Sequence, residues 1–248
     1  MEETYKKVYT KLGLDFRVVA ADSGAIGGSG SKEFHVLADS GEDTIVVCPD
    51  CEYGANIEAA TRKARSFDYS SSGELTKVET VDTKTIEEVA TFLNIPKSQT
   101  IKAVIKKAIY EDKTQIVVFF VRGDDELEET KASNSVNALE LDEASENEII
   151  EAGLVAGYCG PFGLPSKITF VIDNEIKDAK GLACGANEIN YHLKNTDLSI
   201  LENENVCIFS YIFSLRLHAN PVDAAAAYFP ACIPQKRLKN AIISIIPP

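Results

Sequence analysis

Four short groups of polar and glycine residues between positions 80 and 200 are the residues of this chain best suited to do chemistry. A lysine can neutralise an anion, a glycine turn can bring backbone close to a ligand, and a histidine can hold or move a proton. Each group alone is equally typical of a solvent-facing strand, a plain turn or a structural histidine. The groups are Thr100-Ile101-Lys102, Arg122-Gly123-Asp124 with Lys131, Gly157-Tyr158-Cys159-Gly160-Pro161, and Gly185-Ala186-Asn187 with His192.

Hydrophobic patterns predict the elements that position these groups. Residues 100–105 and 115–121 are expected strands, and the second is an unbroken apolar run typical of a strand buried on both faces. Residues 167–173 form a further expected strand. Capping boxes that begin at Thr85 and Ser145 predict the starts of two helices. Mixed strands and helices over this length indicate a compact mixed α/β domain.

The N-terminal part has its own pattern. Residues 2–12 predict an amphipathic helix and residues 16–21 a buried strand, and strands near 34–38 and 44–48 follow. A helix is expected near residues 56–65. The fold class is therefore α/β with mixed sheets in both parts of the chain.

Composition divides the chain into four segments. Ser70-Ser71-Ser72-Gly73 is a linker signal. The tail differs from everything upstream, because its last 39 residues carry four basic side chains and one acidic side chain in a chain of net charge -13. The expected segments are an N-terminal unit (1–67), a linker (68–77), a second domain (78–200) and an atypical tail (201–248).

The glycine-rich stretch Ala21-Asp22-Ser23-Gly24-Ala25-Ile26-Gly27-Gly28-Ser29-Gly30-Ser31-Lys32-Glu33-Phe34-His35, followed by Gly41-Glu42-Asp43, resembles bacterial-type prolyl-tRNA synthetases. It is not a dinucleotide fingerprint, because a strand-like pattern and no helix follows the glycines. The resemblance implies part of a class II aminoacylation core beside the adenylate site, with Glu33 as a substrate-binding residue. It also implies proline, ATP with Mg²⁺ and a homodimer for the complete synthetase.

The order of the four groups resembles the editing insertion domain of these synthetases and the related free-standing aminoacyl-tRNA deacylases, over about Val78 to Leu198. The resemblance implies hydrolysis of mischarged Ala-tRNA(Pro) at the tRNA acceptor end, with no cofactor or metal. Lys102 would bind the terminal adenosine phosphate or neutralise an oxyanion. His192 would position substrate or water, or act as general base if its pKa lay near neutrality. The remaining implied residues are Gly157, Gly160 and Pro161 in the catalytic loop, and Asp173, Arg122, Lys131 and Asn187 toward the substrate.

Two positions depart from the family pattern. Glu128 stands where the family has asparagine, so it either points away from the substrate or weakens the deacylase by repelling phosphate. Lys32 stands where the family has histidine. Synthetase motif 2 would precede residue 1, motif 3 would follow the insertion, and the tail lacks the expected return into the core. We therefore expect at most editing hydrolysis, with a non-catalytic tRNA-binding or assembly module, or a nonfunctional remnant, as the alternatives.

Charge and cysteine usage restrict the function further. A net charge of -13 argues against a surface that coats nucleic acid, although a domain that holds only the CCA end needs few basic contacts. No apolar run approaches the roughly 20 residues of a membrane helix, so we expect a cytoplasmic protein without a membrane partner. Six cysteines without a secretory signal indicate reduced thiols. Cys48 and Cys51 are a close pair without the second pair that a structural zinc site requires. The absence of a Cys/His or Ser/His/Asp spacing pattern argues against a covalent intermediate, and Cys159 within the Gly157 to Pro161 loop is the one residue that leaves it open.

Overall fold

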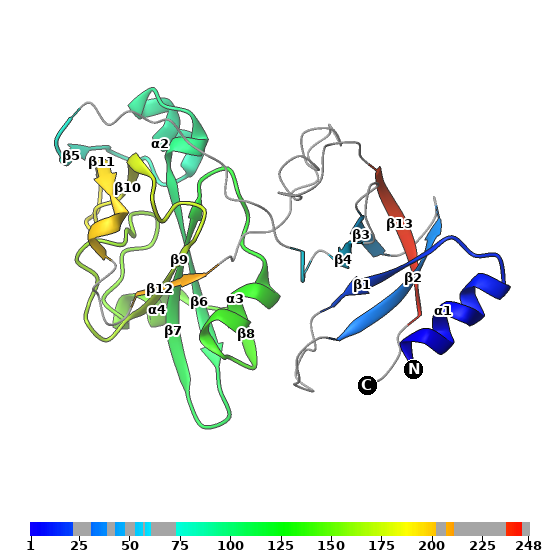
Figure 1. Cartoon of the computed structure of the whole chain (residues 1–248). Coiled ribbons are helices and arrows are strands. Elements are labelled where there is room, and N and C mark those ends of the chain that lie inside the picture. Colours follow the sequence, from blue (N-terminus) through cyan, green and yellow to red (C-terminus); the bar gives the residue numbers. More distant parts are fainter. Residues whose placement is uncertain are drawn as a thin grey trace. The chain divides into compact units, whose positions relative to one another are not determined.

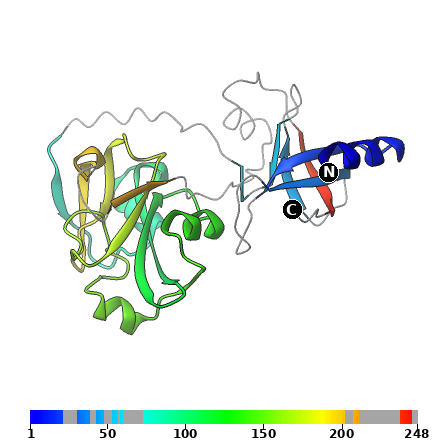
Figure 2. The same ribbon diagram turned by 60° about the horizontal axis from the view of Figure 1, so that its bottom comes forward.

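The computed structural model describes residues 1–21, 31–38, 43–47, 53–56, 58–60, 73–201, 207–210 and 237–244. Its contacts divide the chain into two compact units, residues 1–64 with 215–248 and residues 65–214. Figures 1 and 2 show the ribbon from two directions, and each unit is described by itself. The glycine-rich residues 22–30, the cysteine pair at 48 and 51 and the serines at 70–72 lie outside the described residues.

The larger sheet of the second unit is built on a long hairpin of β6 (Ile101–Ile109) and β7 (Thr114–Arg122), which pair antiparallel along their full length. β8 (Glu140–Glu143) pairs antiparallel with the other edge of β6. β9 (Thr169–Asp173) pairs with β7 in parallel, and β12 (Cys207–Ser210) pairs with β9 in parallel. The strand order is therefore β12-β9-β7-β6-β8, with the hairpin running the length of the unit in Figure 1.

β7 forms the centre of this sheet, and its apolar run is buried on both faces as predicted. Residues 117–121 are fully buried. Val118 and Phe120 face one core cluster together with Phe170 of β9, whereas Phe119 faces a second cluster. Helix α3 (Glu129–Val136) contributes to the second cluster. Each such side chain gains about 1.5–3 kcal/mol on burial, so β7 is a rigid support for the residues at its end.

A smaller antiparallel sheet, in the order β10-β11-β5, lies beside the first residues of β6. It consists of β10 (Lys180–Gly185), β11 (Tyr191–Asp197) and β5 (Thr76–Glu79). Helix α2 (Ile86–Leu93) packs against the apolar surface around Ala183 of β10. A parallel bridge between Thr100 and Ala183 joins this sheet to the start of β6. Short 3-10 turns at Lys97–Gln99 and Leu198–Leu201 complete the unit.

Both predicted capping boxes are present. Thr85 accepts a hydrogen bond from the Glu88 backbone N–H, and the Glu88 carboxylate accepts one from the Thr85 N–H. Ser145 and Glu148 form the same pair at the start of α4 (Glu146–Glu151). The bonds from Ser145, with the Lys107 ammonium, hold the pKa of Glu148 at about 2.

The first unit is a five-stranded barrel in the order β1-β2-β13-β3-β4. Tyr9 of helix α1 packs its ring against Phe16 and Phe34, at centroid distances of 5.2 and 5.5 Å. Figure 2 shows α1 beside the strands of this barrel. The elements are α1 (Glu2–Lys11), β1 (Phe16–Ala20), β2 (Lys32–Ala38), β3 (Asp43–Val47), β4 (Gly54–Asn56) and β13 (Arg237–Ser244).

Two expectations about this part of the chain differ from the structure. The helix expected near residues 56–65 does not begin at Asn56, which ends β4 and accepts a hydrogen bond from the Ala59 N–H at 2.8 Å; residues 61–65 lie outside the described part. The tail from about Ser210 was expected not to return to the core of the first unit, but β13 pairs with β2 and β3. These pairings join residues far apart in the sequence, so local patterns could not predict them.

Candidate functional site

Two backbone segments of the second unit meet at Gly185, in the last position of β10. Gly185 pairs with His192 of β11. A Cβ on Gly160 would lie 1.8 Å from the Gly185 carbonyl oxygen, and a Cβ on Gly185 would lie 2.1 Å from the Tyr158 carbonyl oxygen. Neither position tolerates a side chain, because β10 is in direct backbone contact with residues Gly157 to Pro161, which we call the glycine-proline loop. The structure thus brings the predicted loop together with the strand that carries His192.

Asn187 holds the glycine-proline loop in this position. Its Oδ1 accepts a hydrogen bond from the Gly160 N–H at 2.9 Å, and its Nδ2 donates to the carbonyls of Gly160 and Phe162 at 2.9 and 2.8 Å. Its own N–H donates to the Tyr158 carbonyl at 2.9 Å. Asparagine suits the site, since its φ of 53° is left-handed. The sequence placed Asn187 toward the substrate, whereas the structure shows its amide engaged by the loop.

His192 is buried beside the same loop. Its Nδ1 lies 2.6 Å from the Thr80 hydroxyl oxygen, and its ring centroid lies 5.5 Å from that of Tyr158. Burial lowers the pKa of His192 to about 4. The imidazole is therefore neutral at pH 7, and the condition set for a general base of near-neutral pKa is not met. The expectation that His192 positions substrate or water stays a prediction.

The support for His192 contains two residues that the sequence did not indicate. The Thr80 N–H donates to the Asn190 carbonyl at 2.7 Å, and the Tyr158 hydroxyl donates to Asn190 Oδ1 at 2.8 Å. Asn190 also adopts a left-handed φ of 66°. Thr80 and His192 are 112 positions apart, so no local pattern could link them. The one sequence feature that could have indicated the support of His192 is the turn with Asn187 and Asn190 before β11.

Lys102 is the second residue of β6. An isolated parallel bridge between Thr100 and Ala183 places the start of β6 beside β10. The Lys102 Nζ forms an ion pair with Glu126 Oε2 at 2.7 Å. The role that the sequence gave to Lys102 beside the loop and His192 stays a prediction.

Arg122 and Asp173 are placed differently from the sequence prediction. Both are almost fully buried, at 4% and 1% exposure, at the ends of the adjacent strands β7 and β9. The Arg122 guanidinium donates to Asp124 at 2.7 Å and lies 3.7 Å from a Glu175 carboxylate oxygen. The Asp173 carboxylate accepts the Glu175 N–H at 2.7 Å. This arrangement favours a role in fixing the strand ends over contact with a substrate.

Glu128 is the N-cap of α3. Its carboxylate accepts hydrogen bonds from the N–H groups of Thr130 and Lys131 at 3.3 and 2.7 Å. A carboxylate at this position stabilises a helix start through these bonds and the helix dipole. Of the two outcomes expected for Glu128, the structure therefore shows the one in which the anion points elsewhere. Lys131 lies half-buried in the first turn of α3.

The two cysteines near the loop are poor nucleophiles. Burial raises the pKa of the Cys159 thiol to about 12. Burial, together with the neighbouring Cys159, raises the pKa of Cys184 as well. Because the thiolate is the reactive form, the geometry argues against a covalent intermediate on Cys159.

Comparison with known proteins identifies this unit. Residues 80–202 match the model of the aminoacyl-tRNA editing domain. These residues belong to that family. The chain is 74% identical to proline–tRNA ligase of Aliarcobacter butzleri over 82% of its own length, and 59% identical to that of Nautilia profundicola over 80%. It spans about a third of those relatives, 36% and 35% of their lengths, and carries the editing part of the proline–tRNA ligase family.

A solved structure shows the same fold. The crystal structure of hypothetical protein APE2540 aligns with a TM-score of 0.50 and 19% identity, over 58% of this chain and 95% of that one. At this identity the likeness concerns the fold alone. It agrees with the expected mixed α/β architecture of the editing domain.

Glu33 belongs to the first unit. Its carboxylate lies 2.8 Å from Nε2 of the buried His35, and the neighbouring Lys32 pairs with Glu2 at 2.7 Å. Both carboxylate and ammonium are therefore engaged within the protein, and the substrate-binding role implied for Glu33 stays a prediction. Among the described residues no group of three His, Cys, Asp or Glu side chains could hold a metal, and no helix is long and apolar enough to cross a membrane.

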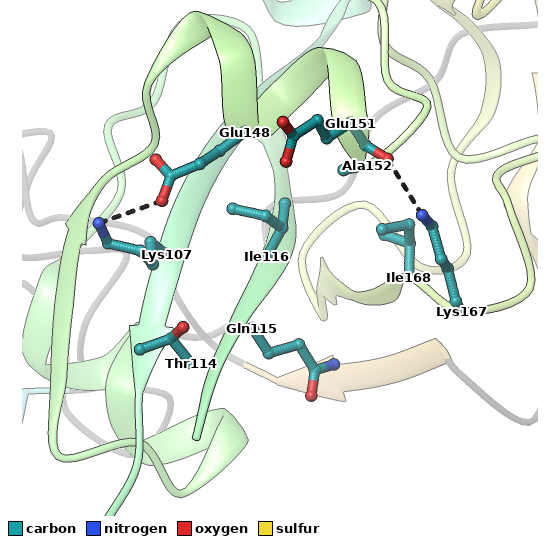
Figure 3. Close-up of a pocket in the computed structure, with 9 residues that line it drawn as sticks. All are labelled: Lys107, Thr114, Gln115, Ile116, Glu148, Glu151, Ala152, Lys167 and Ile168. Carbon is teal, nitrogen blue, oxygen red and sulfur yellow. Dashed lines mark hydrogen bonds and ion pairs between the residues drawn. The ribbon is translucent and has the colours of Figure 1, made fainter. Parts of the chain in front are cut away.

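A hollow of about 310 Å³ lies near the turn of the β6–β7 hairpin, at the end opposite Lys102 (Figure 3). Lys107 pairs with Glu148 across it at 3.3 Å, and the Lys167 ammonium donates to the Glu151 carbonyl at 3.1 Å. No predicted site residue lines this hollow, so it is separate from the editing-domain residues around Gly185. Its lining is Lys107, Thr114, Gln115, Ile116, Glu148, Glu151, Ala152, Lys167 and Ile168.

Proposed function

We propose that this editing domain hydrolyses the ester bond of mischarged Ala-tRNA(Pro), holding the acceptor end of the tRNA. The observation that supports this best is the meeting of the Gly160 loop and the His192 strand at Gly185, in β10, the strand that also bridges to the start of the Lys102 strand at Ala183. A pocket built for proline discriminates against alanine by only about 1–3 kcal/mol, so the relatives' ligation reaction needs a second, hydrolytic site.

The loop serves the reaction through close approach more than through hydrogen bonding. The N–H groups of Tyr158 and Gly160 already donate to Val155 and Asn187, and Pro161 has no N–H. Gly157, which is exposed, adopts a left-handed φ of 82° that a glycine takes without strain, and the Lys84 side chain lies 3.2 Å from where its Cβ would be. Lys102 then supplies the positive charge, and the neutral His192 positions substrate or water. An aminoacyl ester is already activated, so a positioned water suffices without a covalent step.

The remaining activities belong to the complete synthetase and stay proposals for this chain. They are ligation of proline to tRNA(Pro), the use of ATP with Mg²⁺, and a cytoplasmic homodimer. The alternative of a non-catalytic tRNA-binding module drew on Glu128 as a repelling anion and on the acidic balance of the chain. Because Glu128 caps α3, the first argument no longer favours it, whereas the net charge of -13 still does.

The test is release of alanine from Ala-tRNA(Pro) by the purified chain, with Pro-tRNA(Pro) as the reference substrate. We expect faster hydrolysis of the alanyl ester and a large loss in Lys102→Ala. Lys113→Ala, an exposed lysine in the hairpin turn, is the matched control and should keep the parent rate. No release above background would refute the proposal. Equal hydrolysis in the parent and Lys102→Ala would favour the binding module.

A further inference from the structure

The Lys102 ammonium already has an anion beside it in the absence of substrate. Glu126 Oε2 lies 2.7 Å from the Lys102 Nζ. The two side chains are 50% and 22% exposed, so the pair lies at the surface and is open to a ligand. A substrate phosphate that approaches Lys102 therefore meets the carboxylate of Glu126.

The backbone around Glu126 is held firmly. The Gly123 N–H donates to the Thr100 carbonyl at 2.7 Å, and a Cβ on Gly123 would lie 1.9 Å from the Thr100 hydroxyl. The Asp125 N–H donates to the Arg122 carbonyl at 2.9 Å, and Glu128 caps α3 two residues after Glu126. Because backbone hydrogen bonds hold the residues on both sides, the pair can separate by side-chain rotation without a change in this backbone.

We propose that Glu126 is an internal counter-ion of Lys102, which the phosphate of the terminal nucleotide displaces when substrate binds. The inference rests on the proposed function and names the substrate class that the site selects. An ester carried on an RNA 3′ end brings a phosphate that replaces the carboxylate. An ester of an uncharged nucleoside brings none and leaves the ion pair closed.

The strength of this exchange follows from the exposure of the pair. Surface ion pairs contribute little, and breaking one weakens an equilibrium by about twofold to fivefold. Glu126 therefore imposes a modest penalty on RNA binding, which a phosphate can overcome. Removing its charge should strengthen RNA binding by the same factor, because the carboxylate no longer competes with the phosphate for Lys102 and no longer repels the phosphate.

The experiment compares the full chain with Glu126→Gln. Fluorescence anisotropy measures the Kd for an RNA microhelix that ends in CCA, and alanine release measures kcat and KM on the alanylated microhelix and on alanyl-adenosine. We expect Glu126→Gln to lower Kd and the microhelix KM about twofold to fivefold, with kcat and the alanyl-adenosine rate unchanged. Glu111→Gln makes the same charge change at an exposed position in the hairpin turn and should leave every value at the parent level.

Three results would overturn the inference. Equal Kd values for Glu126→Gln and Glu111→Gln would show that no exchange occurs. A lower kcat in Glu126→Gln would show that Glu126 holds Lys102 in place for catalysis. Equal acceleration on alanyl-adenosine would show that Lys102 acts on the ester and not on a phosphate. If the parent hydrolyses nothing while Glu126→Gln still binds RNA more tightly than Glu111→Gln, the proposed function fails and the counter-ion exchange stands.

Discussion

Replacement of Asn187 by alanine tests whether its side-chain amide holds the glycine-proline loop. The change removes three hydrogen bonds, to the Gly160 N–H, the Gly160 carbonyl and the Phe162 carbonyl. It also places alanine at a φ of 53°. Asn137, at the end of α3, has the same φ of 53° and is exposed. Its side chain forms no hydrogen bond within the described residues 73–201. Asn137→Ala is therefore a control that carries the backbone cost alone.

The two variants should differ by the value of the three hydrogen bonds. A left-handed alanine costs about 1–2 kcal/mol in both variants. Each lost hydrogen bond costs about 0.5–1.5 kcal/mol, so Asn187→Ala should lose about 3 kcal/mol more than Asn137→Ala. For a unit of this size that corresponds to a melting temperature about 6–12 °C lower. Because the loop lies against Gly185, hydrolysis of Ala-tRNA(Pro) should fall together with stability.

The assay is urea unfolding followed by far-ultraviolet circular dichroism, since the chain contains no tryptophan. Alanine release is measured at a temperature where both variants remain folded. If Asn187→Ala and Asn137→Ala have equal free energies of unfolding and equal rates, the loop does not depend on the amide and the reasoning is refuted.

Three further predictions concern the same site. Gly160→Ala should abolish hydrolysis, because its Cβ would lie 1.8 Å from the Gly185 carbonyl oxygen. Gly163→Ala should keep hydrolysis, because nothing lies within 4 Å of its Cβ and it carries only the cost of about 1–2 kcal/mol of a left-handed alanine at a φ of 76°; equal rates would contradict the backbone contact. Cys159→Ala should keep most of the hydrolytic activity. The activity of the parent should also resist iodoacetamide at pH 7, because the pKa of the Cys159 thiol is about 12; inactivation by alkylation of Cys159 would contradict this. His192 has a folded pKa of about 4, below its unfolded value of about 6.5, so its contribution to stability is full above pH 6.5 and is lost as the pH falls toward 4. His192→Asn should remove that part of the pH dependence of unfolding, and an unchanged profile would count against a buried neutral imidazole.

The elements that the sequence predicted well are those with a local signal. Both capping boxes join residues three positions apart, and the apolar run of β7 marks a strand covered on both faces. Four elements with weaker hydrophobic patterns were not predicted, namely β8, β10, β11 and α3. β12 and β13 pair with strands far away in the sequence, so no local pattern specified their partners.

The candidate site divides in the same way. The motifs predicted that Lys102, the Gly157 to Pro161 loop and His192 belong together. The structure brings the loop and the His192 strand together at Gly185, whereas the place of Lys102 in one site with them stays a prediction. The sequence could not show that Arg122 and Asp173 are buried at strand ends, because burial depends on what the rest of the chain packs against them.

The sequence by itself determined the family, the residue types available for hydrolysis, and the helix starts and central strand that support them. Only the tertiary structure decided what those residues can do. Asn187 reaches Gly160 across 27 positions and Thr80 reaches His192 across 112. Those contacts fix the loop and surround the imidazole, which burial keeps neutral, and the same packing sets Glu126 against Lys102 and Glu128 against α3. Charge and protonation follow from such neighbours, and folding alone brings them together.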